Sequence, residues 1–555
     1  MSALFLRIFR LLLLPSVIAT WYLYFYPTFH QCTFPSNAST GQPAPFRLLA
    51  FGDPQLEGDT SLPVHGHTEL FPSIWRIVDS IQKHGLGQAT AGVSTESRRL
   101  WHEDLPKALR TCHKKLDLWG NDRYLAHIYR TIHRHTDPTH VVVLGDLLGS
   151  QWIDDNEFGR RAERFWRTVF AGAEKVPSHV AEFKDTPPEP LGEDGSWQNR
   201  IIAVAGNHDI GYAGDIDLDR IERFENAFGR VNYEARFFLN DSSTIDNTTG
   251  QPLDPSLRLV ILNSMNLDEP ASHMDLYQDS NDHLNQRFYW EIPQNPSTGT
   301  ILLTHIPLYK PAGICTDGPF FDYFPHERDS FFSGGIREQN HLSEAVSTRI
   351  LEGVVGPERT RKSIILNGHD HAGCDTYHSR SIVEDIPPPP DPVPQREYED
   401  EDEGSETDDG DAVSQLERKL RKARNDDPPP PAYVPEKWKV QQFPDARRTR
   451  RKNANLTGVR EVTVRSMMGE FGGNAGLLSA WWDQETQEWK FEYGSCQAGV
   501  QHIWWAVHVA DLVTLGVGGL GALLAVVGGG AGGRGKDVAG TRKKKNKKKG
   551  KRKEQ

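Results

Sequence analysis

Residues 364–371 read IILNGHDH, an apolar run that leads through a glycine into two histidines two positions apart. Side chains at positions i and i+2 of an extended segment point to the same side. His369 and His371 can therefore face one point, while Asp370 faces away. Such a pair can hold a metal ion, but two solvated loop histidines would have the same sequence, so the rest of the chain must decide.

Apolar runs that end in polar turns recur along the chain. They are short and rich in Val and Ile, as is typical of strands buried inside an α/β sandwich. They are FRLLAFGD from Phe46, THVVVLGD from Thr139, RIIAVAGNHD from Arg200, LRLVILNS from Leu257, GTILLTHIP from Gly299 and RKSIILNGHDH from Arg361. Helical stretches lie between them, for example 117–135 and 157–170, and REVTVRSM, LLSAWWD and EWKFEY indicate closing strands. The pattern predicts the α/β class.

Side chains that can ligate a metal follow five of these runs. In α/β layers ligands bind outside the carboxyl ends of the strands, so we expect these side chains to converge. Singly each has a structural explanation, such as a helix cap, an Asx turn or a core histidine, and it is their coincidence that predicts a site. They are Asp53, Asp146, the run Asn207, His208 and Asp209, then His305, and finally His369 and His371.

The order D-P-Q … G-D … G-N-H-D … H … G-H-D-H spans residues 53–371 and resembles the motif set of the calcineurin-like metallophosphoesterases. The resemblance implies a two-sheet β-sandwich flanked by helices, with two metal ions between the sheets. It implies that Asp53 and His371 hold the first ion, that Asn207, His305 and His369 hold the second, and that Asp146 bridges both. It also implies that His208 lies beside the phosphate and that Asp209 orients His208.

The residue types fit that assignment. Two divalent cations about 4 Å apart repel each other, and a shared carboxylate such as Asp146 offsets the repulsion. Mixed carboxylate, amide and imidazole ligands favour Mn²⁺, Fe²⁺ or Zn²⁺ over Ca²⁺. Such ions would supply a nucleophilic water and neutralise the phosphate oxygens, while His208, as a cation, would stabilise or protonate the leaving oxygen.

Two positions depart from the family pattern. Gln55 stands where most members have a histidine, and Gly149 stands where an acidic or amide residue is usual. Gln55 remains a candidate metal ligand, but its amide oxygen binds more weakly than imidazole, so we expect a looser first site and a preference for Mn²⁺. Gly149 is not a ligand position, and we expect no loss of catalysis from it.

Both ends of the chain carry segments suited to a membrane. Arg7 and Arg10 precede an uncharged stretch that ends in Trp and Tyr, and its length and bulk favour a retained signal anchor over a cleaved signal peptide. Residues 512–533 are uncharged and followed by a basic tail, which favours a second transmembrane helix over an apolar linker. The positive residues predict that both termini are cytosolic and that the body, about 30–505, is luminal.

Charge is distributed unevenly. The net charge is −12, yet the residues from Arg534 onward contain twelve Lys and Arg against two acidic residues, so the remainder carries −22. A basic tail on an acidic body suits anionic lipid and argues against a nucleic-acid binder. Lys551 and Lys553, at the fifth- and third-last positions, resemble the dilysine retrieval signal that a coat receptor reads on endoplasmic-reticulum membrane proteins.

Residues 382–457 contain two proline runs, a strongly acidic run and RRTRRK, and they cannot bury enough apolar surface to fold. We predict a disordered insertion there. The predicted organisation is then a cytosolic stub and signal-anchor helix (1–29), a metallophosphoesterase domain (44–381) closed by strands at 458–500, the insertion (382–457), a second transmembrane helix (509–533) and a basic cytosolic tail (534–555).

Cysteines and sequons are compatible with a luminal body. The five cysteines show no C-x-x-C spacing, and because their number is odd at least one thiol is free or paired outside the chain. Their pairing stays open: Cys32, Cys112, Cys315, Cys374 and Cys496. Four N-glycosylation sequons lie at Asn37, Asn240, Asn247 and Asn455.

The D-P-Q variant, the two spans, the THIPLYKPAGIC stretch and the lysine-rich tail together resemble the GPI-glycan-remodelling metallophosphoesterases of the endoplasmic reticulum. The resemblance implies a membrane-anchored phosphodiesterase that removes an ethanolamine-phosphate branch from a mannose of the GPI anchor and so promotes export of the anchored protein to the Golgi. The implied partners are GPI-anchored proteins, membrane lipid and, through Lys551 and Lys553, the coat-protein retrieval machinery.

Two other functions stay open. One is another luminal phosphoesterase of the same fold, acting on phosphomonoesters such as phosphoproteins or nucleotides. The other is a non-catalytic cargo-sorting or scaffold protein with a vestigial site. A luminal body disfavours cytosolic phosphoproteins as substrates, and a vestigial site should have lost ligands, whereas all but one position matches here.

Overall fold

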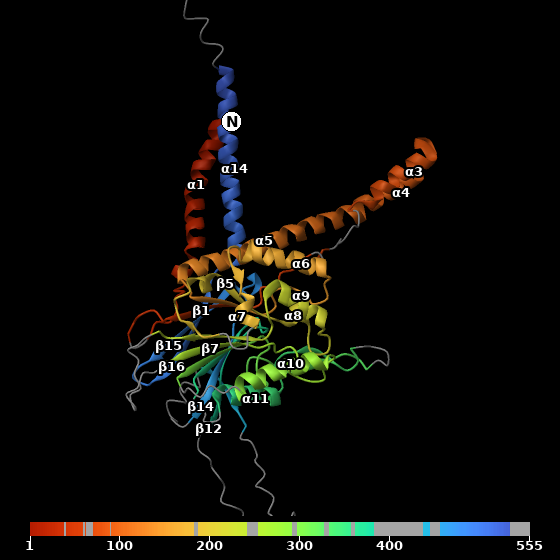
Figure 1. Ribbon diagram of the computed structural model, residues 1–555. Helices are drawn as coiled ribbons and strands as arrows, with labels where there is room; N and C mark the ends of the chain where they lie inside the picture. Colours follow the sequence, from red (N-terminus) through yellow and green to blue (C-terminus); the bar gives the residue numbers. More distant parts are fainter. Residues whose placement is uncertain are drawn as a thin grey trace, which may run out of the picture.

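The computed structural model describes residues 1–37, 40–58, 61–62, 70–88, 90–182, 187–240, 254–290, 297–326, 332–356, 361–381, 437–443 and 456–532. Within them the chain forms two large β-sheets, helices on both sides of the sheets, and one apolar helix at each end of the sequence (Figure 1). The predicted α/β fold with two sheets and terminal apolar helices is therefore confirmed.

The first sheet holds the strands that precede Asp53, Asp146 and Asn207. Its order is β16 (Glu488–Gln497), β15 (Asn474–Asp483), β1 (Phe46–Phe51), β2 (His140–Leu144), β5 (Arg200–Val204) and β3 (Glu174–Lys175). β1, β2, β5 and β3 run parallel, whereas β15 is antiparallel to both of its neighbours, β1 and β16. The carboxyl ends of β1, β2 and β5 therefore share one edge.

The second sheet holds the strands that precede the histidines. Its order is β13 (Lys439–Gln442), β12 (Cys374–Ser381), β14 (Leu456–Thr463), β11 (Ser363–Asn367), β8 (Thr298–Leu303), β7 (Ser256–Ile261), β6 (Tyr233–Phe238) and β4 (Glu189–Pro190). The central strands β14, β11, β8 and β7 are parallel, and a separate pair joins β9 (Phe321–Tyr323) to β10 (Ile336–Gln339).

One strand lies inside the segment predicted as a disordered insertion. Most of 382–457 is outside the described residues, but Lys439–Gln442 forms β13 and pairs antiparallel with β12, and β14 begins at Leu456. The composition of the flanking proline and arginine runs hid this four-residue edge strand, because its sequence, KVQQ, carries little apolar signal of its own.

Helices cover the outer faces of the sheets. The longer ones are α3 (Pro72–Gln88), α4 (Thr90–Arg99), α5 (Leu105–Thr136), α6 (Asp155–Arg164), α9 (Leu218–Phe228), α10 (Met274–Asn285) and α11 (Glu344–Val355), and the short ones are α7 (Ser178–Glu182) and α8 (Asn207–Ile210). Side-chain caps begin three of the longer ones: Asp154, Asp217 and Ser343 each accept a hydrogen bond from the backbone three residues on. The helical stretch predicted at 117–135 lies within α5, and the one at 157–170 within α6 and the turn that follows it.

Alternate strand residues build two apolar layers. Leu48 of β1 packs in the core between the two sheets, with Ile301 of β8 and Leu366 of β11. Leu49, the next residue, points to the opposite face and packs in the helical layer with Ile128 of α5. Because neighbouring strand residues face opposite sides, continuous apolar runs are required here, as the sequence predicted.

The terminal helices α1 (Ser2–Tyr24) and α14 (Gln501–Gly532) lie side by side on one side of the body (Figure 1). Both are long and apolar enough to cross a membrane by length and composition. Asp511 of α14 is paired, since its carboxylate accepts hydrogen bonds from the hydroxyls of Ser16 and Thr20 of α1. A carboxylate in an apolar helix is costly unless it is bonded in this way.

Two disulfides join distant parts of the chain. Cys32, which follows α1 and the short α2 (Tyr26–Phe29), is bonded to Cys496 at the end of β16. Cys315 is bonded to Cys374 at the start of β12, and Cys112 is free and exposed. The first bond ties the base of α1 to the residues just before α14.

α5 and α14 meet at a glycine, and this contact yields a test of the packing. A Cβ on Gly120 of α5 would lie 1.7 Å from the ring of Trp505 of α14, whereas a Cβ on Gly159 of α6 would meet nothing within 4 Å. We expect Gly120→Ala to lower the free energy of unfolding by about 1–3 kcal/mol through overpacking. Gly159→Ala, the matched control, should raise it by up to about 1 kcal/mol because alanine favours helix.

Thermal unfolding of the two variants in detergent measures the difference. Equal melting temperatures for Gly120→Ala and Gly159→Ala would contradict the contact between α5 and α14.

Candidate metal centre

The candidate ligands lie where strands of the two sheets end. Asp53 follows β1 and Asp146 follows β2, and these strands are neighbours. His305 follows β8 and His369 follows β11, which are neighbours in the other sheet. Asn207 opens α8 directly after β5. The sandwich therefore brings these candidate ligands, which are spread over more than three hundred residues of sequence, close together.

The backbone at this place is strained. Asp53, Gln55, Asp146 and His369 have φ angles of 44°, 42°, 48° and 72°, in the left-handed region that non-glycine residues rarely adopt. Such conformations cost about 1–3 kcal/mol each and are typical of functional sites. Gly145 is needed beside them, because a Cβ on it would lie 2.1 Å from His305 Nδ1.

Three ligand atoms converge around Asn207. Its Oδ1 lies 3.1 Å from His305 Nε2 and 2.9 Å from His369 Nδ1. The other ring nitrogens are engaged: His305 Nδ1 donates to the carbonyl of Leu144 at 2.7 Å, and His369 Nε2 donates to that of Gln339 at 2.8 Å. These bonds leave the lone pairs of His305 Nε2 and His369 Nδ1 aimed at the same point as the amide oxygen.

A second set of ligand atoms gathers around Asp53. Atoms of Asp53, Asp146 and His371 lie within 4.8 Å of one another, and so do atoms of Asp146, His305 and His369. Asp146 belongs to both sets, the place expected of a bridging carboxylate. The Gln55 amide lies beside the first set, with Nε2 3.0 Å from Asp146 Oδ2 and 3.2 Å from His371 Nε2.

Electrostatics indicate that the centre fits cations. Asp53 is fully buried, its Oδ2 has no hydrogen-bond partner among the described residues, and burial followed by the charge of Asp146 raises its pKa well above the ordinary value. Burial also acts to raise the pKa of Asp146, but His305 and His208 hold it below the ordinary value. Divalent ions would neutralise these carboxylates and occupy the converging lone pairs, so the residues present fit two metal ions.

His208 lies at the open side of the centre. Its backbone amide donates to Asp146 Oδ1 at 2.9 Å, and its Nε2 lies 3.9 Å from Asp146 Oδ2. The side chain is 37% exposed, whereas the ligands Asp53 and His305 are buried. An imidazole in this position can meet a substrate that approaches from solvent.

The expected role of Asp209 needs correction. Asp209 makes no hydrogen bond to His208 in the described part of the chain. Its carboxylate instead accepts from three backbone amides, those of Leu147, Leu148 and Gly206, at 2.9–3.1 Å. Adjacent residues of a helix do not face each other, which explains why Asp209 points away from His208. Asp209 fixes the loop after Asp146 against the start of α8.

Two supporting residues were not predicted from the sequence. Gln339 of β10 supplies the carbonyl that orients His369, and Ser466, after β14, donates from its hydroxyl to the carbonyl of Asp53 at 3.0 Å. The amide of Ser466 also donates to the carbonyl of His371. Neither residue belongs to a recognisable motif, since one acts through its backbone and the other is a single serine.

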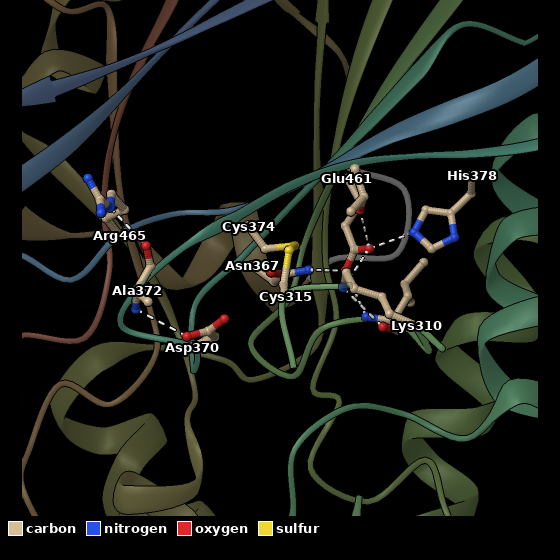
Figure 2. Close-up of a disulfide and its surroundings, with 11 residues drawn as sticks. Lys310, Cys315, Asn367, Asp370, Ala372, Cys374, His378, Glu461 and Arg465 are labelled. Carbon is tan, nitrogen blue, oxygen red and sulfur yellow. Dashed lines mark hydrogen bonds and ion pairs between the residues drawn. A yellow bond between two sulfur atoms is a disulfide. The ribbon is translucent and has the colours of Figure 1, made fainter. Parts of the chain in front are cut away.

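A buried charge network centred on Glu461 joins Lys310, Asn367 and His378 (Figure 2). Glu461 of β14 accepts from the amide of Leu308, the Lys310 ammonium, the Asn367 amide group and His378 Nε2, at 2.6–2.9 Å. Burial acts to raise the pKa of Glu461, but Lys310 and His378 together hold it well below the ordinary value. Glu461 thereby fastens the residues after β8 to β11, β12 and β14.

A cavity of about 360 Å³ opens beside the histidines. Its lining includes His369, Asp370, His371 and Phe471. The Cys315–Cys374 disulfide and Lys310 also line it, and Figure 2 shows both next to the Glu461 network. The centre is thus accessible to a ligand larger than water.

The two ligand sets predict distinct losses of metal. After dialysis against Mn²⁺, we expect about two ions per chain in the native protein, because two sets share Asp146. Asn207→Ala and His371→Ala should each leave about one ion, and Asp370→Asn, between the two histidines, should keep both. Mass-spectrometric metal analysis gives the count, and full occupancy in Asn207→Ala would contradict the assignment.

The Glu461 network predicts a large loss of stability. Glu461→Gln leaves Lys310 buried without its counter-charge, so the free energy of unfolding should fall by about 3–5 kcal/mol. Asp375→Asn, which breaks the more exposed ion pair to Arg460 on the same two strands, should cost under about 1 kcal/mol. Chemical denaturation compares the two, and similar losses would show that Glu461 is not the anchor.

Comparison with known proteins finds relatives of this chain in two yeasts. It is 27% identical to Protein TED1 of Saccharomyces cerevisiae over 90% of this chain and 95% of that protein. It is 31% identical to an uncharacterized protein of Schizosaccharomyces pombe over 49% of this chain and 60% of that one. No family model matches.

The chain is also 24% identical to metallophosphoesterase 1 of Macaca fascicularis, over 45% of this chain and 54% of that protein. The chain thus spans nearly all of TED1 but only about half of metallophosphoesterase 1. Together with the two ligand sets that meet at Asp146, these matches confirm that the chain is related to the metallophosphoesterases.

Proposed function

We propose that this protein is a phosphodiesterase, dependent on two divalent metal ions, that hydrolyses an ethanolamine-phosphate branch on a mannose of GPI anchors in the endoplasmic reticulum. In this proposal the reaction promotes export of the GPI-anchored proteins that are its substrates. The observation that carries the hydrolytic part is the pair of ligand sets sharing Asp146 next to an open cavity. The substrate follows from the family resemblance of the motifs and ends of the chain.

Contacts among the described residues support this chemistry. Bound divalent ions would supply a nucleophilic water and neutralise the phosphoryl oxygens. Backbone carbonyls orient His305 and His369. Backbone amides of His369 and His208 bond the carboxylates of Asp53 and Asp146. His208, which is partly exposed, is in a position to donate a hydrogen bond or a proton to the leaving oxygen.

We propose Mn²⁺ as the metal. Of the candidate ligands, Gln55 offers an amide where an imidazole is usual in the family, which lowers the preference for Zn²⁺. A Gln55→His variant should then shift the preference of the first site toward Zn²⁺.

The cavity lining also fits the proposed substrate. An ethanolamine-phosphate group carries an ammonium two carbons beyond the phosphate oxygen. Asp370 is partly exposed between His369 and His371, and Phe471, whose ring meets His371 edge-on at 4.8 Å, lines the same cavity. A carboxylate and an aromatic face are the groups that bind ammonium ions.

We further propose that the body lies in the lumen and both termini in the cytosol. Two disulfides suit an oxidising compartment, and the apolar helices at the two ends suit two spans. Lys551 and Lys553, outside the described residues, would then be available to retrieval machinery in the cytosol, and cycling through the Golgi would follow. Glycosylation at Asn37 or Asn240 would accompany this topology.

Product analysis tests the activity. The purified full-length protein with Mn²⁺ should release ethanolamine phosphate from a defined GPI glycan, and chelation should abolish the release. Asp146→Asn removes the bridging charge and should lower kcat/KM by at least about 100-fold, as expected for a residue that holds both ions. An unchanged rate in Asp146→Asn would overturn the catalytic role, and a GPI glycan left intact while a model diester is cleaved would overturn the substrate alone.

Asp370→Asn tests the ammonium contact. Loss of the carboxylate should reduce the preference for an ethanolamine phosphodiester over its methyl analogue by about tenfold, corresponding to about 1.4 kcal/mol. Kinetics on the two esters give the ratio. A preference that does not change would show that Asp370 does not contact the ammonium.

A further inference from the structure

We propose that α5, together with the hairpin of α3 and α4, forms an arm that lies on the surface of the bilayer beside the two terminal helices. The arm would bind lipid through an apolar stripe made of Leu109, Leu116 and Trp119. The proposal rests on the terminal helices spanning a membrane and is independent of the catalytic activity.

The stripe is exposed and has the spacing of a helix face. Leu109, Leu116 and Trp119 are 62%, 55% and 53% exposed, respectively, and are separated by seven and three residues. At 3.6 residues per turn they lie on one side of α5. Trp101, 67% exposed, continues the apolar surface at the segment before α5, and Trp75 of α3 is 61% exposed. Large apolar side chains in this number on one arm need a partner surface.

The side of α5 opposite the stripe faces the part of the protein that contains the two sheets. Lys114, about half a turn from Leu116, forms an ion pair with Glu57 at 3.0 Å. Farther along, Asp122 is paired with Arg164, the last residue of α6, at 2.7 Å. The stripe is therefore not the face that holds α5 on the sheets.

The stripe continues into the membrane helices. Trp119 lies 6.3 Å, ring centre to ring centre, from Trp505 near the start of α14, and Asn121 accepts from the side chain of Gln501. His127, farther along α5, meets Tyr24 at the end of α1. Both terminal helices thus rest on α5, and Figure 1 shows them rising from it on one side while the sheets lie on the other.

The arm is held as one unit. α3 and α4 pack together as a hairpin, with Arg76 paired to Glu96 at 3.2 Å. The amide of Ser73 donates to buried Asp104 at the junction with α5. The arm extends beyond the edge of the sheets on the side of the terminal helices (Figure 1).

Lipid is the occupant that the surroundings favour. The apolar stripe of α5 lies next to the base of the two terminal helices. If these helices span a membrane, they bring the stripe to the surface of the bilayer. Trp side chains flanked by cations are typical of the interface between water and lipid, and here the Arg123 guanidinium lies 5.7 Å from the Trp119 ring centre. Arg98 and Arg99 end α4 near Trp101. An amphipathic helix with these features lies in the plane of the interface.

Cys112 provides a native probe of this surface. It is exposed on the stripe between Leu109 and Leu116, and the other four cysteines are in disulfides. The full chain, labelled at Cys112 with an environment-sensitive fluorophore, is reconstituted into phosphatidylcholine nanodiscs. Quenching by doxyl groups on the lipid chains is then compared with quenching by aqueous iodide.

We expect lipid-borne doxyl to quench the probe at least about twofold more strongly than it does in the variant Leu109→Glu/Leu116→Glu. Iodide should show the opposite order. Lys107→Glu, at an exposed position about half a turn around α5 from Leu109, is the matched control and should behave as the native chain does.

Two results would overturn the proposal. Strong iodide quenching with none by doxyl lipid in the native chain would show that the stripe faces water. Protection from both quenchers would show that protein, such as a second copy of the chain, covers it. Far-ultraviolet circular dichroism checks that the double variant is folded, and if it is not, the native chain alone decides between these outcomes.

Discussion

The structure depends on placing two carboxylates, Asp53 and Asp146, in a buried site where Asp53 Oδ2 has no hydrogen-bond partner among the described residues. Like charges in such surroundings repel, and only counter-ions or protons relieve the repulsion. Everything nearby is built to hold them: the parallel pair β1 and β2 sets their separation, left-handed backbone turns them inward, and Ser466 and the His369 amide bond the Asp53 residue. Bound divalent cations would relieve the repulsion between these carboxylates. The geometry of the site is therefore consistent with the relationship to metallophosphoesterases.

The sequence predicted the site because of a simple property of parallel sheets. Strands that run the same way end at the same edge, so polar residues after β1, β2 and β5 gather at one edge of the first sheet, and those after β8 and β11 gather at one edge of the second. The sandwich then brings these two edges together. The sequence could not predict which way a side chain points within a turn. Asp209 follows His208 in the motif, yet its carboxylate points to backbone amides instead, and no pattern of residue types encodes that choice. Glu461 was hidden because one acid in the alternating strand REVTV has the appearance of a solvent-facing position.

The ends of the chain were predicted as membrane segments, but their relation to each other was not. Asp511 lies just before the uncharged stretch from which the second span was inferred, and only the three-dimensional structure reveals that Ser16 and Thr20 bond to it. Of the arm formed by α3, α4 and α5, the sequence predicted only the helical stretch 117–135. Its charges are spread over most of its length, so the narrow apolar stripe barely changes the average composition.

The pairing of β1 with β15, near opposite ends of the sequence, has a consequence for biosynthesis. The strand that carries Asp53 emerges from the ribosome early, but its antiparallel neighbour and the helix that packs against α1 are made more than four hundred residues later. Contacts this far apart in sequence form slowly. Until β15 has been made, β1 leaves one edge of its sheet unpaired, and such an edge can pair with strands of other chains. Maturation therefore depends on factors that shield exposed strands in the compartment where the chain folds.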